Sequence, residues 1–423
     1  RYRFADAGPL DVYLEPERTL QSVAQSLGTE ASRELRRFLS RSAEIWDAAA
    51  PHFVWSEAPA WHGLLTGGWA QLRAVGRIDP LRTLQASIEQ TVKTPELRML
   101  LERYATYNGS DVRRAPGTLA CIAHVELGLG GYGVQGGMHE LVRSLVRTAQ
   151  DLGVRMVAES PVTELLWESG RVAGVRCGQR EHRAQAVVFN GEVAALAEGL
   201  LPKDAPSSGF KETERSMSAV NAIYRARRRQ GAERRVAHEV LFPRDYLAEF
   251  SALFDEHRAP AEPTLYLCAQ EACHGRTGWE QEEPVFVMAN APAVDPRVPD
   301  GDTERLSATM ESRLYEHGLL SPGDRRVFLR TPADLARRFP SSRGALYGAA
   351  SNGAMSAFRR PPNALSQLPG LYLASGSAHP GGGLPMVAAS GRQAALAVLD
   401  DLGAPASTLR LLSHPQSPRS RHA

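Results

Sequence analysis

The pattern of apolar and polar positions predicts helices and strands that alternate along much of the chain. Apolar residues recur at helical spacing through MHELVRSLVRTAQDLG, residues 138–153, and Gly153 ends that pattern. The segment VTELLWESGRVAGVRC predicts a β-hairpin that turns at Ser169-Gly170. VRMVAE predicts a strand, AQAVVFNG predicts a buried strand, and EVAALAEGLL predicts a helix. This order is typical of an α/β nucleotide-binding domain with a small β insertion.

The regions before and after this unit follow other patterns. The opening RYRFADAGPLDVYLEPERTLQSVAQSLG predicts two short strands across a turn and a helix that begins near Glu17, and residues 17–105 are mostly helical in pattern. Residues 211–340 mix the strands TLYLCAQ and PVFVMAN with the helix DTERLSATMESRLYEHG, which predicts a second domain. The strand GLYLAS then leads through a glycine turn into the helix MVAASGRQAALAVLDDL, and the tail after Leu412 is predicted to be disordered. Prolines interrupt the first helical region at Pro51, Pro59 and Pro80.

Composition narrows the class of protein. A length of 423 residues suggests two or three domains, or one large discontinuous fold. The 43% hydrophobic and 23% charged residues are ordinary for a globular protein, and a net charge of +2 offers no electrostatic case for nucleic-acid binding. The longest stretch without Asp, Glu, Lys or Arg, residues 361–391, holds several prolines and cannot be a spanning helix. The sequence predicts neither a transmembrane segment nor a signal peptide.

The cysteines do not form a disulfide framework or a recognisable metal motif. None of the four takes part in a C-x-x-C pair, which favours a reducing compartment. Cys268, Cys273 and His274 are close in sequence, but their spacing is poor for zinc, and no metal site is predicted. The remaining two cysteines are Cys121 and Cys177.

Two glycine-rich stretches are candidates for a phosphate or cofactor turn. Gly128, Gly130 and Gly133 spell G-x-G-x-x-G, which has meaning only between a strand and a helix. In GLYLASGSAHPGGGLPMVAASGRQAA, an apolar strand runs to Gly376, and the three glycines 381–383 precede a helix. Such a turn exposes backbone N–H groups at the positive end of a helix dipole, although a plain tight turn fits equally well. His379 beside this turn is interpreted as a structural histidine rather than a base.

The second stretch resembles a known family. GSAHPGGGLPMVAASGRQAA is similar to the closing motif of the bacterial-type phytoene desaturases, FAD-dependent carotenoid desaturases of the amine-oxidase-like flavoprotein superfamily. SAFRRPPN (356–363) resembles the segment that precedes this motif, and GYGVQGGMHELVRSLVRTAQDLGVRM resembles the middle segment. APGTLACIAHVE, FPRDYLAEFSALFD and PTLYLCAQ look most like the 1-hydroxycarotenoid 3,4-desaturases (methoxyneurosporene dehydrogenases). By this resemblance, residues 128–133 are a loop and short strand that lead to Gly136-Gly137, not the pyrophosphate turn.

The resemblance implies an α/β fold with a discontinuous Rossmann-like FAD-binding domain, an α+β substrate domain and a helical membrane-facing subdomain. The family begins with a βαβ unit of about 30 residues that binds the flavin pyrophosphate. Because no such unit precedes RYRFADAG, the native polypeptide is expected to continue upstream of Arg1. The expected divisions are the start of the substrate domain (1–16), the helical subdomain (17–116), the middle FAD-binding part (117–205), the substrate domain (206–342), the closing FAD-binding part (343–412) and the tail (413–423).

The resemblance also implies a flavin site, although no catalytic residue is assigned. The backbone of Val162 would face the adenine, with an ordinary strand valine as the alternative, and Asn190 would close a strand at the site or cap the helix near Glu192. Arg103, Tyr104 and Tyr107 fall where the family has polar channel residues, although a solvated helix face is the favoured interpretation of Arg103. The predicted cofactor-binding residues are Gly136, Gly137, Met138, Val162, Asn190, Gly376, Gly381, Gly382, Gly383, Pro385 and Met386.

Other catalytic motifs do not compete with this interpretation. The sequence contains no G-x-S-x-G, H-E-x-x-H or P-loop pattern. If CIAHVE is a strand, His124 and Glu126 point to one side and form a buried polar pair rather than a catalytic dyad.

The function implied by the resemblance is FAD-dependent desaturation of an acyclic C40 carotenoid, at C3–C4 of a 1-hydroxylated substrate. The alternatives are a carotenoid isomerase, another oxidase of the superfamily, or a flavin-free remnant without activity. The electron acceptor would be oxygen or a quinone. A tryptophan-rich stretch predicts a membrane contact and tunnel mouth, with buried core tryptophans as the alternative, so the protein would be cytoplasmic and peripheral on the inner membrane. The tryptophans are Trp46, Trp55, Trp61 and Trp69.

Overall fold

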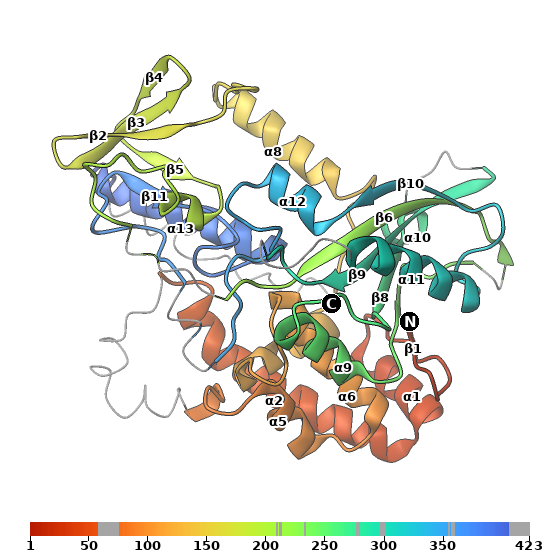
Figure 1. Ribbon diagram of the computed structural model, residues 1–423. Helices are drawn as coiled ribbons and strands as arrows, with labels where there is room; N and C mark the ends of the chain where they lie inside the picture. The colour runs from red at the N-terminus through yellow and green to blue at the C-terminus, as the bar shows by residue number, and fades with distance from the viewer. Residues whose placement is uncertain are drawn as a thin grey trace.

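A computed structural model places a helical layer against a mixed sheet, with a smaller α/β part beside both (Figure 1). It describes residues 1–57, 76–208, 210, 214–231, 234–275, 280–295, 302–353, 356 and 360–405. The helical layer begins with α1 (Pro16–Leu27) and the long α2 (Thr29–Phe53). It continues with α5 (Leu84–Thr91), α6 (Pro95–Glu102), a 3-10 helix (Arg103–Asn108), a second 3-10 helix (Gly117–Ala120), α7 (Cys121–His124) and a π-helix (Val125–Leu129).

The substrate-type part is built on a six-stranded sheet in the order β1-β7-β8-β9-β6-β10. β1 runs parallel to β7, and the other neighbouring strands are antiparallel. Its other elements are α9 (Tyr246–Phe250), a π-helix (Ser251–Asp255), α10 (Gln270–His274), α11 (Asp302–Glu316) and α12 (Pro332–Arg338). The strands are β1 (Tyr2–Arg3), β6 (Ser218–Arg227), β7 (His238–Leu241), β8 (Leu265–Ala269), β9 (Glu282–Ala291) and β10 (Arg325–Arg330).

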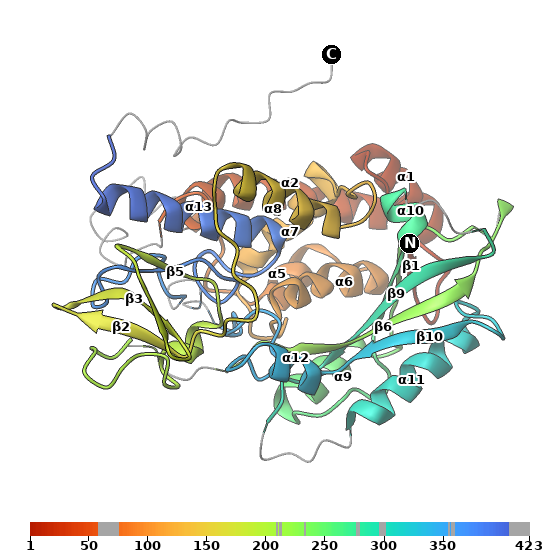
Figure 2. The same cartoon turned by 90° about the horizontal axis from the view of Figure 1, so that it is seen from above.

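Alternation along the strands sends side chains to two separate cores. Every second residue of β6, from Val220 to Ala226, is buried in the core that α11 covers. The other side of the sheet adjoins the helical layer, where Val240 and Phe242 share a core with α2 and α5. Figure 2 shows the sheet between α11 and the helical layer. The central strands are therefore buried on both faces, whereas the edge strand β10 is largely exposed.

The part that the sequence predicts to be nucleotide-binding consists of two small sheets and two helices. β5 (Val187–Phe189) and β11 (Leu371–Leu373) form a parallel pair, and β2 (Glu164–Glu168), β3 (Arg171–Cys177) and β4 (Arg180–Arg183) form an antiparallel sheet. α13 (Leu384–Asp401) contacts β11. α8 (His139–Asp151) buries none of its residues, and Val142 and Leu145 are exposed. The pattern predicted this helix correctly, but did not predict that its apolar face lies open.

Five local predictions are wrong. CIAHVE forms helical turns rather than a strand, so the alternation argument for His124 and Glu126 does not apply. VRMVAE is irregular and largely exposed, because no strand of the described chain pairs with it. The residues before Gly136-Gly137 form a loop without a strand, and Val188 in the expected buried strand is exposed. α2 also continues past Pro51 to Phe53, although proline has no N–H for the bond to the preceding turn. No described helix combines the length and apolar character that crossing a bilayer requires.

Candidate functional site

The three-glycine turn between β11 and α13 needs glycine for two different reasons. Gly381 and Gly383 have φ angles of +139° and +97°, which side chains other than glycine rarely adopt. At Gly382 the constraint is space, because a Cβ there would lie 2.3 Å from Cδ1 of Tyr347. Gly383 has no other atom within 4 Å of the position of its missing Cβ. The turn therefore packs against Tyr347 at Gly382 and faces open space at Gly383.

The open end is also the start of α13. Leu384 and Pro385 in its first turn are exposed, and Met386 is half-buried. The first N–H groups of a helix have no partner inside the helix and carry a partial positive charge. This turn can therefore receive a flat ligand with a negatively polarised edge.

Asn363 fixes the turn between the strand and the helix. Its Nδ2 atom lies 2.8 Å from the carbonyl oxygen of Leu373, 3.0 Å from that of His379 and 3.1 Å from Ser390 Oγ. The side chain is buried, so these contacts are shielded from water. One amide thus holds the end of β11, the turn and α13 together, a role that sequence reasoning did not assign to it.

Arg360 places a buried positive charge beneath the same turn. Its Nη1 donates to the carbonyl oxygen of Gly376 at 3.2 Å, and its Nη2 donates to Asn108 Oδ1 at 3.0 Å. Burial lowers its pKa to about 10, although the charge of Glu192, which pairs with Arg215, acts in the opposite direction. A buried cation with neutral partners is unfavourable by itself, and an anionic or electron-rich group nearby would stabilise it.

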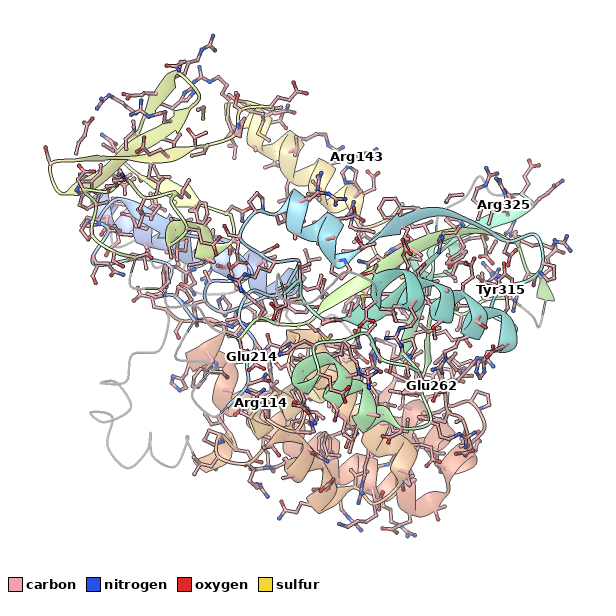
Figure 3. All side chains as sticks on the ribbon, viewed as in Figure 1. Arg114, Arg143, Glu214, Glu262, Tyr315 and Arg325 are labelled. Atoms are coloured by element: carbon pink, nitrogen blue, oxygen red, sulfur yellow. The ribbon has the colours of Figure 1, made fainter. Side chains whose placement is uncertain are left out.

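A cavity of about 760 Å³ opens beside this arginine. Arg114 and Glu214, which lie side by side in Figure 3, form an ion pair of 2.7 Å in its lining. Arg360 and Ser377 line it next to the turn. Its apolar wall consists of Val193, Ala194, Ala197, Phe210, Ala349, Ala350 and Pro361. The rest of the lining is polar or charged, and it includes Glu192, Glu198 and Arg215. The cavity therefore combines an apolar wall with a strongly polar one, and the polar side lies next to the turn.

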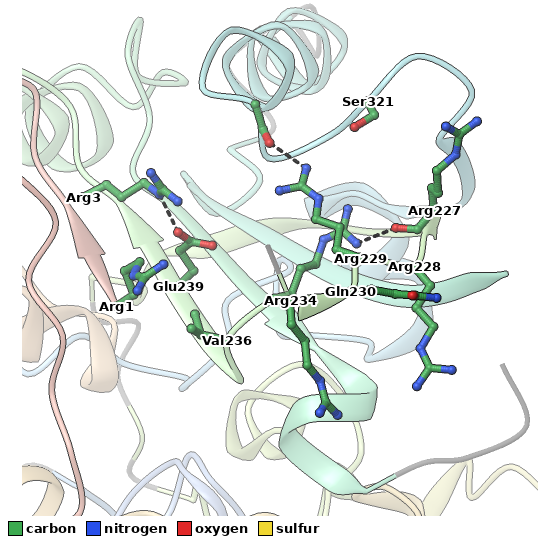
Figure 4. A pocket seen from close by; sticks show the side chains of 12 residues that line it. Arg1, Arg3, Arg227, Arg228, Arg229, Gln230, Arg234, Val236, Glu239 and Ser321 are labelled. Carbon is green, nitrogen blue, oxygen red and sulfur yellow. Dashed lines mark hydrogen bonds and ion pairs between the residues drawn. The ribbon is translucent and has the colours of Figure 1, made fainter. Parts of the chain in front are cut away.

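A second cavity, of about 720 Å³, has a different character (Figure 4). Arg3 pairs with Glu239 in its wall, and Arg235 pairs with Glu283 behind it. A wall dominated by guanidinium groups suits hydrocarbon poorly. The arginines that line it are Arg1, Arg3, Arg227, Arg228, Arg229, Arg234 and Arg235.

The structure brings only some of the predicted site residues together. Gly376 and residues 381–386 form one turn, and Asn190 joins it because its side-chain amide donates to the carbonyl oxygen of Ala374. Asn190 does not cap the following helix, since Glu192 takes that position. This bond links the ends of β5 and β11.

The other predicted positions lie on different segments. Gly136 and Gly137 have φ angles of +84° and +107° directly before α8, and the Gly136 N–H donates to the carbonyl oxygen of His274 at 2.9 Å. Met138 and Val162 are exposed, with 42% and 44% of their surface accessible. The literal G-x-G-x-x-G at 128–133 starts inside a π-helix rather than after a strand, so it is no pyrophosphate turn.

The polar residues of the helical layer form a network. Glu126 accepts hydrogen bonds from Tyr107, from Tyr2 at 3.2 Å and from Tyr104 at 3.3 Å. Arg103 donates to the Tyr107 hydroxyl and is buried, so it does not lie on a solvated helix face. Burial raises the pKa of Tyr104 well above its usual value, which keeps this hydroxyl a hydrogen-bond donor.

The fold and the glycine turn together define a cofactor-dependent oxidoreductase of the α/β type, and comparisons with known proteins agree. Residues 60–399 match the family model described as flavin containing amine oxidoreductase. An oxidoreductase from Methanosarcina mazei shares the fold with a TM-score of 0.51 and 16% identity, covering 81% of this chain and 75% of that one. Cyclohexylamine oxidase from Brevibacterium oxydans gives a TM-score of 0.50 at 14% identity, covering 87% and 75%.

Curated proteins that are similar to most of this chain include carotenoid desaturases. Hydroxyneurosporene desaturase of Rubrivivax gelatinosus is 35% identical over 95% of this chain and 77% of the relative. The protein of the same name from Cereibacter sphaeroides is also 35% identical, over 95% and 81%. A 1-hydroxycarotenoid 3,4-desaturase of Flavobacterium sp. is 33% identical over 74% of this chain and 65% of the relative.

The chain belongs to the flavin-containing amine oxidoreductase family, which confirms the resemblance, and it is an FAD-dependent oxidoreductase. The turn and its surroundings fit this cofactor. Gly382 leaves no room for a Cβ, Gly383 faces open space, and Arg360 is a buried cation that donates to the neutral oxygen atoms of Gly376 and Asn108. These three features suit a flat ring system with an electron-rich edge.

Proposed function

We propose that this protein desaturates an acyclic C40 carotenoid in carotenoid biosynthesis, at the C3–C4 bond of a 1-hydroxylated substrate. The observation that carries the proposal is the 35% identity to a hydroxyneurosporene desaturase along 95% of the chain. The cavity beside the glycine turn supports it in part, because one side of its mixed lining is apolar and its buried arginine suits the cofactor.

The chain's own residues hold and orient the reactants. Desaturation removes a hydride from one carbon and a proton from its neighbour, and FAD supplies the hydride acceptor when bound. We propose that the backbone of Gly381–Gly383 and the Arg360 guanidinium hold the flavin, with Asn190 fixing the strand ends beside them. Gly136, Gly137, Met138 and Val162 are proposed to complete the cofactor site. No side chain is assigned as a base, since a conjugated polyene can delocalise the positive charge until the proton leaves.

The protein is proposed to work on a bilayer surface. A C40 hydrocarbon enters water poorly, so its enzyme must take it from the membrane. Trp55 at the end of α2 is 38% exposed, whereas Trp61 and Trp69 lie outside the described residues. We propose a peripheral location on the cytoplasmic side of the inner membrane, with oxygen or a membrane quinone as electron acceptor. The helical part, the substrate part and the cofactor parts keep the divisions expected from the sequence.

Expression of the encoded polypeptide in a host that makes 1-hydroxylated acyclic carotenoids tests the proposed activity. The expected product has one further conjugated double bond, and its absorption maximum shifts to longer wavelength. The same experiment with Gly8→Ala, a glycine with open space and no unusual backbone angle, provides the control. Geometric isomers without a new double bond would indicate an isomerase instead. No pigment change with any acyclic carotenoid would overturn the proposal.

A further inference from the structure

We propose that His238, Cys268 and Cys273 form a binding site for a thiophilic divalent metal ion such as Zn²⁺, separate from the flavin turn. The sequence brought Cys268 and Cys273 together only with His274, at a poor spacing for zinc. In the fold the third ligand is instead His238 of β7, which lies directly opposite Cys268 of β8 in the sheet register. Cys273 approaches from α10, the helix that follows β8.

The distances between the ligand atoms suit a tetrahedral ion. One nitrogen of His238 and the sulfur atoms of Cys268 and Cys273 all lie within 4.8 Å of one another. The His238 Nε2 and Cys273 Sγ atoms are 3.4 Å apart. Bonds of about 2.3 Å to sulfur and about 2.0 Å to nitrogen at a tetrahedral angle require about 3.5 Å between such atoms. His238 Nε2 and Cys273 Sγ are therefore already separated by the distance that two ligands of one zinc ion require.

Neighbouring groups orient the ligands as a metal site requires. The Tyr266 hydroxyl lies 2.8 Å from His238 Nδ1, which directs Nε2 toward the thiols. The side-chain N–H of Gln270 donates to Cys268 Sγ at 3.3 Å, a bond that stabilises a thiolate. Histidine rings at metal sites are commonly fixed through their second nitrogen in this manner.

The donor set selects the kind of metal. Two sulfur atoms and one imidazole favour Zn²⁺ over Mg²⁺ or Ca²⁺, which prefer oxygen ligands. Among the described residues, no carboxylate belongs to this cluster. His238 is exposed, so an ion can enter from solvent and water can complete the fourth position.

A bound ion would brace a contact that the flavin part uses. α10 carries Cys273, and the carbonyl oxygen of its last residue, His274, accepts the hydrogen bond from Gly136. The chain is close-packed here, because a Cβ on Gly133 would lie 2.0 Å from the carbonyl oxygen of Cys273. An ion that fixes α10 to β7 and β8 therefore also steadies the loop that leads into α8.

Titration of the reduced, metal-free encoded polypeptide with Co²⁺, followed by competition with Zn²⁺, tests the site without any assay of activity. We expect one Co²⁺ per chain with a sulfur-to-cobalt charge-transfer band, and displacement of that band by Zn²⁺. Cys268→Ser and Cys273→Ser should abolish the band. The control is Cys177→Ser, whose thiol lies on β3 in another sheet, and it should titrate like the wild type.

A second variant keeps the test decisive if a serine at buried Cys268 prevents folding. His238→Ala removes an exposed ring, and its Co²⁺ affinity should fall at least about tenfold while far-ultraviolet circular dichroism stays unchanged. Absence of Co²⁺ uptake by the reduced protein would overturn the proposal, as would a band that survives in the two cysteine variants. A Cys268–Cys273 disulfide that forms in air, with no uptake of metal after reduction, would overturn it in favour of a redox pair.

Discussion

Single residues at the turn show why its sequence is restrictive. Gly382 faces the ring of Tyr347. The backbone N–H of Tyr347 donates to Ser216 Oγ at 3.0 Å, and this bond restricts movement of the residue away from the turn. Arg360 lies below and bonds to the carbonyl oxygen of Gly376. The turn is therefore shaped by packing from one side and by a positive charge from the other.

Gly382→Ala should damage both stability and cofactor binding. The new methyl group would lie 2.3 Å from a Tyr347 ring carbon, and such overpacking costs about 1–3 kcal/mol in the free energy of unfolding. Displacing the turn should also lower the FAD content of the purified protein. Urea unfolding and flavin absorbance measure the two effects, with Gly8→Ala as the matched control. Equal stability and flavin content in the two variants would refute the packing argument.

The glycines of this turn could be located from the sequence, but their supports could not. The amino-acid sequence itself shows three adjacent glycines between an apolar strand and a helix. The role of Arg360 depends on its burial beside the turn, and the role of Asn363 depends on its contacts with β11, the turn and α13. Both residues lie in the SAFRRPPN segment, so the family resemblance marked the region without giving the physical reason.

Among the helices and strands, local sequence patterns predicted an element correctly where the element's own residues determine its conformation. The hairpin at Ser169-Gly170 formed as predicted because both residues adopt the positive φ angles that its turn needs, +49° and +80°. Residues 121–129 became helical because the packing of α7 against α2 overrides β-like alternation. Residues 154–158 have strand-like composition, but a strand also needs a neighbour, which a local pattern does not reveal.

The folded state should lose stability in acid because of His379. His379 Nε2 lies 3.0 Å from the carbonyl oxygen of Ser56, just beyond α2, and burial together with Arg360 lowers the pKa of the ring below 6.5. The unfolded state therefore takes up this proton first as the pH falls below 6.5, and the folded state loses stability. The loss from this ring is at most about 1.4 kcal/mol per pH unit.

Urea unfolding at about pH 7.5 and about pH 5.5 measures this dependence. His379→Gln should lose less stability between the two conditions than the wild type does. His139→Gln, which changes an exposed ring at the start of α8, serves as the control. Identical losses in the wild type and His379→Gln would show that His379 does not contribute.

For the whole molecule, the turn lies where three parts of the chain meet. Gln393 of α13 donates to the carbonyl oxygen of Trp55 at 2.8 Å, and Arg360 reaches Asn108 of the helical layer. Tyr347, which follows the substrate sheet, covers Gly382. These contacts could not be predicted from local sequence patterns, because they join residues hundreds of positions apart.

This arrangement places the proposed membrane contact next to the cofactor site. Trp55 is exposed, while the segment around it contacts α13 through Gln393 and the residues before the glycine turn through His379. Trp55→Ala combined with Trp61→Ala should reduce flotation with liposomes, because tryptophan favours the bilayer interface. The control is Trp167→Ala, on β2 of the nucleotide-binding part. Undiminished flotation of the double variant would exclude this stretch as the contact.

A crystal structure of the encoded polypeptide with FAD bound is the most direct test of whether the three glycines hold the flavin. We expect the isoalloxazine ring to contact the backbone of Gly381–Gly383, with Arg360 beneath the turn and the cavity open beside it. A flavin ring bound elsewhere, with the three glycines facing bulk solvent, would contradict the account.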